Sequence, residues 1–168
     1  MGMVFQIAGS SSKILIDPQR LALLGQDMDP CTAMAGQVGS QVKMRVGTVW
    51  LVASVRAMML DQASQSIVAD IDFLGEGDEE RLTGRIFNFR RGVTRYPTPG
   101  TEIFPVSSKD MQQIYAADDR PHVQIGTVYP TTDTRAALYV DQMLGKHFAL
   151  LGSTGTGKST SAALILHR

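Results

Sequence analysis

The sequence predicts a mainly β fold, in which a small N-terminal β-barrel precedes the first strand, a glycine-rich loop and a helix of an α/β domain. Over about the first hundred residues, short runs of β-branched and aromatic residues alternate with Gly, Pro, Ser and Asp turn signals. Near the end, a glycine-rich stretch separates an apolar run from a helix-compatible segment. The composition, 43% hydrophobic and 19% charged over 168 residues, provides enough apolar material for one sizeable core or two small ones.

Alternating patterns and turn signals mark the strands of the expected barrel. Two hairpins come first, one from "MVFQIAG" and "KILID" around a run of serines, and one within "QVKMRVGTVWLVASV" with its turn near Gly47. The segment "SIVADIDFLG" then alternates apolar and polar residues, and "GRIFNFRRG" and "TEIFPV" follow in the same style. The apolar positions of the alternating segment are Ile67, Ala69, Ile71 and Phe73. A closed barrel is favoured because closure removes exposed strand edges.

The remaining segments carry weaker signals. Residues 22–39 contain Gly, Pro and Asp breakers without periodicity and are expected to form a surface insertion. After the barrel, "SSKDMQQIYAA" predicts a helix with a serine cap, and "HVQIGTVYP" predicts a strand. "TTDTRAA" is interpreted as a linker or turn, and "LYVDQMLGKH" as a short helix that ends at Gly145. The expected domains are a barrel over residues 1–116, a connector over 117–137 and the start of the α/β domain over 138–168.

Charge is distributed unevenly along the chain, although the formal net charge is zero. Seven acidic and no basic residues lie between Asp61 and Glu80, whereas five arginines and no acidic residue lie between Arg81 and Arg95. One interpretation is that the two runs occupy adjacent strands and pair across a sheet. The other is a bipolar surface for DNA or a protein partner. The arginines expected to make such contacts are Arg90, Arg91 and Arg95.

The strongest motif is "GSTGTGKST", which matches the Walker A pattern of a P-loop NTPase domain: a glycine, four residues and then Gly-Lys-Ser. An apolar run at residues 148–151, suited to a buried parallel strand, precedes it. Residues 159–167 are compatible with a helix whose apolar face is expected from Ala162, Ala163, Ile165 and Leu166. Strand, loop and helix therefore occur in the required order. The expected nucleotide-binding residues are Gly152, Ser153, Thr154, Gly155, Thr156, Gly157, Lys158, Ser159 and Thr160.

These residue types suit the binding of ATP with Mg²⁺. The glycines allow backbone N–H groups to turn toward a phosphate that would collide with a Cβ atom. Lys158 would reach the β- and γ-phosphates, Ser159 would ligate Mg²⁺ through its hydroxyl, and Thr160 would lie on the α-phosphate side. Hydrolysis also needs a second acidic strand, Walker B, and an arginine finger, for which the sequence shows no candidate. The catalytic residues therefore stay unassigned. The chain looks like the front part of a longer ATPase and is expected not to hydrolyse ATP alone.

Three stretches resemble the HerA-type ATPases of the HerA/FtsK superfamily: "FRRGVTRYPTPGTEIFPVS", "IGTVY" and, most diagnostically, "MLGKHFALLGSTGTGKST". Rotary ATP synthase subunits come second because they lack the lead-in of the last stretch. The resemblance implies a HAS barrel and a homo-hexameric, ATP-driven translocase or helicase on double-stranded DNA. It also implies a nuclease partner such as NurA in DNA end processing and repair, or a Sir2-like or other effector in antiphage defence. The alternative is a non-catalytic β-barrel assembly module that docks such a partner.

Composition also limits the location of the protein and its metal chemistry. Cys31 is the only cysteine, which excludes an internal disulfide framework and suits a reducing cytoplasm. No apolar run approaches the roughly 20 residues that cross a bilayer, and the N-terminus lacks a secretory signal. His122, His147 and His167 lie far apart without further ligands at zinc-binding spacing. A cytoplasmic protein without membrane association or a zinc site is therefore expected.

Overall fold

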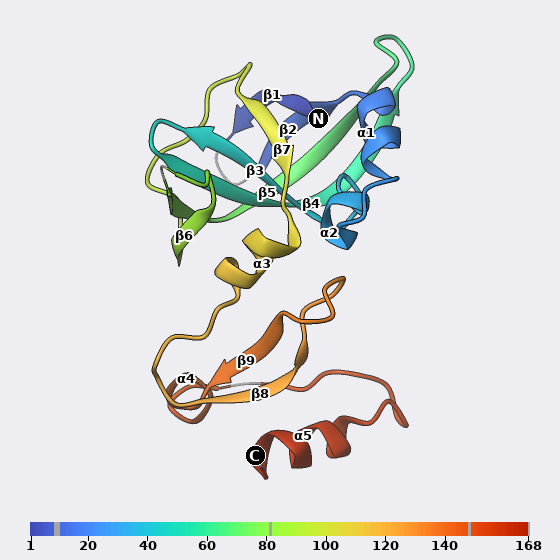
Figure 1. The fold of residues 1–168 in the computed structure, drawn as a ribbon. Helices are drawn as coiled ribbons and strands as arrows, with labels where there is room; N and C mark the ends of the chain where they lie inside the picture. Colours follow the sequence, from blue (N-terminus) through green and yellow to red (C-terminus); the bar gives the residue numbers. More distant parts are fainter. Residues whose placement is uncertain (9–10, 81, 148, 168) are drawn as a thin grey trace. The chain divides into compact units, whose positions relative to one another are not determined.

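Contacts divide the chain into two compact units, Met1–Ile114 and Tyr115–Arg168. Strands dominate the first unit, drawn from blue to yellow in Figure 1, and the second unit combines a hairpin with two helices. The computed structural model describes residues 1–8, 11–80, 82–147 and 149–167. The fold is mainly β, as predicted.

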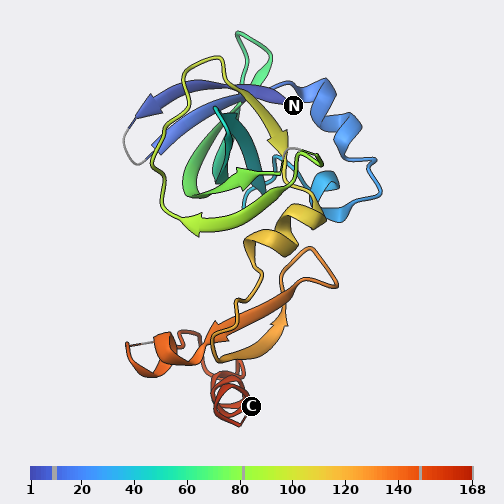
Figure 2. The ribbon, with the colours of Figure 1, turned by 60° about the vertical axis from the view of Figure 1, so that its left-hand side comes forward.

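The first unit contains a closed, six-stranded antiparallel barrel. The strand order is β2–β1–β7–β3–β4–β5, and pairing of β5 with β2 closes the ring. Figure 2 shows the strands curving round a common centre. A further strand, β6, pairs with β5. The strands are β1 (Gly2–Ala8), β2 (Ser11–Ile16), β3 (Gln41–Val46), β4 (Val49–Asp61), β5 (Ser66–Glu79), β6 (Ile86–Arg91) and β7 (Glu102–Pro105). The predicted barrel and both hairpins at its start are confirmed.

Strand β5 belongs to the ring and also carries β6. One of its edges pairs with β4 along nearly its whole length. On the other edge, Ile67–Ile71 pair with β2, and residues 75–79 pair with β6. The β4–β5 ladder contains bulges at Val52/Ala53 and at Val55/Ala57. Because bulges bend and twist a strand, they let this long ribbon follow the curvature of the barrel.

Inward-facing side chains of the strands form one apolar core. The alternation predicted for β5 is confirmed, because Ala69 and Ile71 are fully buried while Ile67 and Phe73 pack against the core. The buried members of this core are Val4, Ile14, Ile16, Val42, Met44, Leu51, Ala53, Val55, Ala69, Ile71 and Ile103. Burial of these apolar surfaces is the main source of stability for the barrel.

Residues 22–39, expected to form a surface insertion, are more than half exposed, and they also contain helical turns that were not predicted. Two short helices, α1 (Pro18–Leu24) and α2 (Pro30–Ala33), lie in this region. Each follows an Asp-Pro pair, in which the aspartate caps the helix and the proline occupies its first turn. Leu21 packs against the barrel core, and Cys31 and Ala35 are buried. Asp29 and Pro30, interpreted as loop breakers, are therefore a helix-start signal.

Two carboxylates fix helix α3 (Ser108–Ile114), which was predicted from its sequence. Asp110 is 2% exposed and accepts a hydrogen bond from Lys43 Nζ at 2.7 Å. Asp29, the cap of α2, accepts hydrogen bonds from the Ser108 N–H at 2.8 Å and the Ser108 hydroxyl at 2.7 Å. Burial raises the pKa of Asp29, but the Ser108 bonds and the capped α2 amides outweigh it, so the pKa lies below its usual value.

The acidic run of β5 pairs with the arginine run, which confirms the first of the two interpretations for Arg90. Glu76 and Arg90 are cross-strand partners, with Arg90 Nη2 2.8 Å from Glu76 Oε1. The Glu76 side chain is 1% exposed and also accepts a hydrogen bond from the Thr94 N–H at 3.0 Å. The Thr94 N–H lowers the pKa of Glu76, burial opposes this effect, and Arg90 adds to the lowering. The carboxylate is therefore held in its charged form.

The described residues of the second unit form an antiparallel hairpin and two helices. Residues 135–137 pair with Gln124–Thr127, so the interpretation of "TTDTRAA" as a linker or turn is wrong for its last three residues. Cross-strand hydrogen bonds to a partner determine this strand, and its short sequence carries too little periodicity to show them. The helix end predicted at Gly145 is confirmed. The elements are β8 (His122–Thr127), β9 (Arg135–Tyr139), α4 (Val140–Leu144) and α5 (Lys158–Leu166). The domain boundaries at residues 116 and 137 stay predictions.

The barrel core predicts a large cost for truncating Leu51, which is 0% exposed. Leu51→Ala is expected to lower the free energy of unfolding by about 2–5 kcal/mol, through lost apolar burial and the cavity left behind. Urea unfolding followed by circular dichroism measures this change. The matched control is Leu82→Ala, since Leu82 is 96% exposed and its truncation should change the stability by no more than about 0.5 kcal/mol. Equal effects of the two substitutions would contradict the assigned core.

The Glu76 site predicts a pH-dependent contribution to stability. Because its pKa is lowered in the folded state, the charged carboxylate stabilises the fold above the ordinary glutamate pKa of about 4.3, and this contribution disappears as the pH falls through the lowered value. Glu76→Gln is therefore expected to destabilise the barrel most at neutral pH, with a difference from the unaltered chain that shrinks in acid. Urea unfolding at several pH values measures it, with Glu102→Gln on β7 as the charge control. A difference that is constant with pH would refute the assignment.

Candidate functional site

The Walker A segment lies in the second unit, in a loop that leads into α5. The strand expected at residues 148–151 is not formed in its described part, since residues 149–151 have no strand pairing. Phe148 lies outside the described residues. A parallel strand exists only beside a neighbouring strand, and the described residues place none next to this segment. Helix α5 begins one residue earlier than predicted and ends at Leu166.

Three glycines shape the loop in different ways. Gly155 and Gly157 have φ angles of +85° and +81°, in the left-handed region that side chains with a Cβ rarely adopt. At Gly152, an added Cβ would lie 2.7 Å from Thr156 Oγ1, too close for a real contact. The first two glycines thus allow the backbone to turn, and Gly152 leaves space inside the loop.

The Lys158 side chain folds back along this loop. Its Nζ donates to the Gly152 carbonyl at 2.9 Å and to the Ser153 carbonyl at 2.5 Å. The Thr156 hydroxyl donates to the same Ser153 carbonyl at 2.8 Å. The motif therefore brings one ammonium group against the backbone carbonyls of the loop.

The start of α5 provides backbone donors next to this ammonium. Gly157 precedes the helix without a side-chain cap, and the Ser161 N–H, 2.9 Å from the Gly157 carbonyl, makes the first hydrogen bond of the helix. The N–H groups of residues 157–160 precede that bond and have no acceptor within the helix. Together with the helix dipole they favour an anion. The arrangement fits a phosphate group.

The same first turn offers one hydroxyl for Mg²⁺. Ser159 is exposed there, beside Lys158. Within the described ranges, no three His, Cys, Asp or Glu residues gather at metal-binding distance. A P-loop does not require such a cluster, because phosphate oxygens and water complete the coordination of Mg²⁺. Ser159 fits this single-ligand role.

Helix α5 keeps its apolar side chains largely uncovered. Of the face expected to pack, Ala162 and Ile165 are half-buried, while Ala163 and Leu166 are exposed. Leu164 is 44% exposed. The apolar composition of the helix was identified correctly, but the described residues bury none of its side chains fully.

The three candidate DNA-contacting arginines occupy different environments in the first unit. The Arg90 side chain is 50% exposed, and its guanidinium contacts both Glu76 and Asp78, at 2.8 and 3.8 Å. Arg91 and Arg95 are exposed at the end of β6 and in the segment after it. Arg90 thus pairs with carboxylates of β5. Contact of these three arginines with DNA or a partner stays a prediction.

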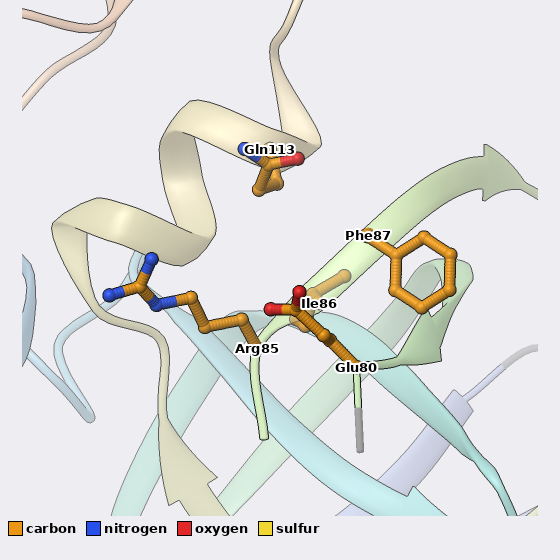
Figure 3. A pocket seen from close by; sticks show the side chains of 5 residues that line it. All are labelled: Glu80, Arg85, Ile86, Phe87 and Gln113. Carbon is orange, nitrogen blue, oxygen red and sulfur yellow. The ribbon is translucent and has the colours of Figure 1, made fainter. Parts of the chain in front are cut away.

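A hollow of about 300 Å³ lies between α3 and the β5–β6 turn (Figure 3). In Figure 3 the Arg85 side chain extends along α3, and the Phe87 ring lies on the other side of Glu80. The Glu80 carboxylate accepts a hydrogen bond from the Thr83 hydroxyl within the turn. The lining residues are Glu80, Arg85, Ile86, Phe87 and Gln113. All of them belong to the first unit, so the hollow takes no residue from the Walker A loop.

Two features were not predicted from the sequence. One is the capping of α1 and α2 by Asp17 and Asp29. The other is the hydrogen bond between Thr156 and Ser153 within the Walker A loop. The two Asp-Pro pairs at the starts of α1 and α2 were readable as capping signals. Thr156 was included among the phosphate-binding residues, but nothing in the sequence indicated that its hydroxyl bonds to Ser153.

Among the described helices, none combines the length and apolar character needed to cross a membrane.

Comparison with known proteins relates this loop and the barrel to one family. A family model described as the central domain of the helicase HerA matches residues 123–168, from β8 through α5. The DNA double-strand break repair helicase HerA of Pyrococcus furiosus is 31% identical over 126 residues, which cover 70% of this chain and 21% of that protein. The chain thus spans about a fifth of the length of this relative. The two matches and the closed barrel relate this chain to the HerA-like ATPases.

Proposed function

We propose that this chain supplies the phosphate-binding loop and the N-terminal barrel of an ATP-driven DNA translocase of the HerA type. The observation that carries the proposal is the loop itself, in which Lys158 Nζ lies against the backbone and the first N–H groups of α5 have no acceptor within the helix. The matched HerA central domain includes this loop, and the name of the Pyrococcus relative describes a helicase of double-strand break repair. ATP with Mg²⁺ is the proposed ligand, and double-stranded DNA is the proposed substrate.

In this proposal the residues of the chain bind and orient the nucleotide. The N–H groups of the loop and of the first turn of α5 donate to the phosphate oxygens. Lys158 adds a positive charge at the β- and γ-phosphates, and Ser159 holds Mg²⁺ through its hydroxyl. Bound ATP supplies the phosphoanhydride bond whose hydrolysis drives translocation. Catalytic groups are not assigned to residues of this chain.

The assembly we propose is a homo-hexameric ring with a partner on the barrel. The HerA resemblance supports the ring and a nuclease of the NurA kind, or a Sir2-like or other effector in antiphage defence. A second candidate function is that the barrel alone acts as a non-catalytic docking module for that partner. The exposed Met3 and Phe5 on the outer face of β1, at 50% and 55%, favour a contact surface there.

Nucleotide binding tests the proposal through Lys158. Lys158→Ala is expected to weaken binding of Mg·ATP roughly ten- to hundredfold, because a charge-assisted contact to phosphate is lost. Isothermal titration calorimetry with the unaltered chain and the variant measures the change. Lys146→Ala is the matched control, since Lys146 is exposed in the same unit but lies outside the motif. Equal ATP binding by the Lys158 variant and the unaltered chain would leave the docking module as the better function.

Binding of DNA by the barrel is expected to depend on salt through Arg91 and Arg95. If each contacts one phosphate, its replacement by alanine should reduce the slope of log affinity against log salt concentration by about 0.9. Fluorescence anisotropy with labelled double-stranded DNA at several salt concentrations measures the slope. Arg20→Ala on α1 is the control for the loss of one exposed arginine. Unchanged slopes for both variants would remove these residues from the DNA contact.

A further inference from the structure

The Ser153 carbonyl is the point at which the Walker A loop closes on itself. It accepts one hydrogen bond from the Thr156 hydroxyl at 2.8 Å and one from Lys158 Nζ at 2.5 Å. The Thr156 N–H is a third and longer donor to the same oxygen, at 3.4 Å. The hydroxyl and the ammonium make the two short contacts, which correspond to the two lone pairs of a carbonyl oxygen. The position of the lysine ammonium is therefore linked to that of the threonine hydroxyl through a single oxygen atom.

Gly152 creates the space that this arrangement occupies. A Cβ at Gly152 would lie 2.7 Å from Thr156 Oγ1 and 3.6 Å from Lys158 Cγ, so the hydroxyl and the lysine stem lie beside its Cα atom. An ammonium group has three N–H donors. The carbonyls of Gly152 and Ser153 accept from Lys158 Nζ, which leaves donor capacity for a phosphate oxygen. The lysine is thus held in place without losing its ability to bind an anion.

We propose that Thr156 is a positioning residue for nucleotide binding, whose hydroxyl fixes the Ser153 carbonyl and thereby the Lys158 ammonium. This inference rests on the proposed binding of ATP by the loop. Thr156 acts through Lys158 and requires no contact of its hydroxyl with the nucleotide. A lysine that is already ordered loses less conformational freedom when the phosphate arrives, which strengthens binding. The hydroxyl is the essential group, so serine can replace threonine and valine cannot.

The test compares Thr156→Val, which keeps the shape of the side chain and removes the donor, with Thr156→Ser, which keeps the donor. Valine is expected to weaken Mg·ATP binding about five- to tenfold, the size of one lost hydrogen bond, and serine by less than about twofold. Isothermal titration calorimetry on the whole chain measures both. Valine that binds ATP as tightly as threonine, or serine that binds as weakly as valine, would overturn the proposal.

A double-mutant cycle with Lys158→Ala separates positioning from a general loss of structure. If Thr156 acts through the ammonium, valine should weaken ATP binding by less than about twofold further once the lysine is gone. An unreduced effect of valine in that background would refute the coupling. Melting temperatures check folding, and if Thr156→Val does not fold, Thr156→Ala takes its place with the same expectations.

The experiment also separates this inference from the proposed function. If the unaltered chain shows no binding of ATP, the proposed function fails and the role of Thr156 fails with it. If the unaltered chain binds ATP and Lys158→Ala weakens it while Thr156→Val does not, the function holds and only the role of Thr156 is refuted.

Discussion

The shared edge of β5 is the constraint on which the barrel depends. Strand β2 closes the ring on one half of this edge, and β6 occupies the other half. The approach of β6 requires two glycines, because a Cβ at Gly75 would lie 2.6 Å from Phe89 Cζ, and one at Gly77 would lie 2.5 Å from Ile86 Cγ2. Without side chains at these positions, β6 packs directly against the part of β5 that extends beyond its pairing with β2.

This close packing gives the β5–β6 pairing its register. It brings Arg90 and Thr94 to the buried carboxylate of Glu76, which accepts hydrogen bonds from both. A slip by one residue would leave Glu76 buried without these donors, and an unpaired buried charge costs far more than a surface one. The ion pair therefore selects one register, whereas burial of apolar side chains supplies most of the stability.

Two other carboxylates also fix the position of neighbouring segments through hydrogen bonds. Asp29 caps α2 and also holds the start of α3 through Ser108, so one carboxylate joins segments that are 79 residues apart. Asp110 ties α3 to Lys43 of β3. The loop before α5 differs from these sites, because its bonds join residues at most six positions apart. Its geometry is a local property of the motif, which explains why a short sequence pattern identifies it.

The sequence alone predicted the strands of the barrel, their hairpin order and the glycine-rich Walker A loop. It could do so because alternation of side chains along a strand and the left-handed glycines of the loop are local requirements. It did not predict the helical turns within residues 22–39, although the Asp29-Pro30 signal was present, nor that residues 135–137 form a strand. Both depend on partners elsewhere in the chain: Ser108 for the first and the β8 residues for the second.

Only the tertiary structure decided how the charges are used. The runs of acidic and basic residues favoured pairing over a binding surface, but they did not show which carboxylate becomes inaccessible to water. The fold buries Glu76 and brings Arg90 to it, and leaves Arg91 and Arg95 exposed. Likewise, the motif determined that Thr156 belongs to the loop, and the folded backbone decided that its hydroxyl bonds to Ser153. Which side chains become buried, and which groups they bond to, is decided only when the chain folds and separate segments come together. The periodicity of apolar residues and the conformational preferences of glycine are properties of the sequence and exist before folding.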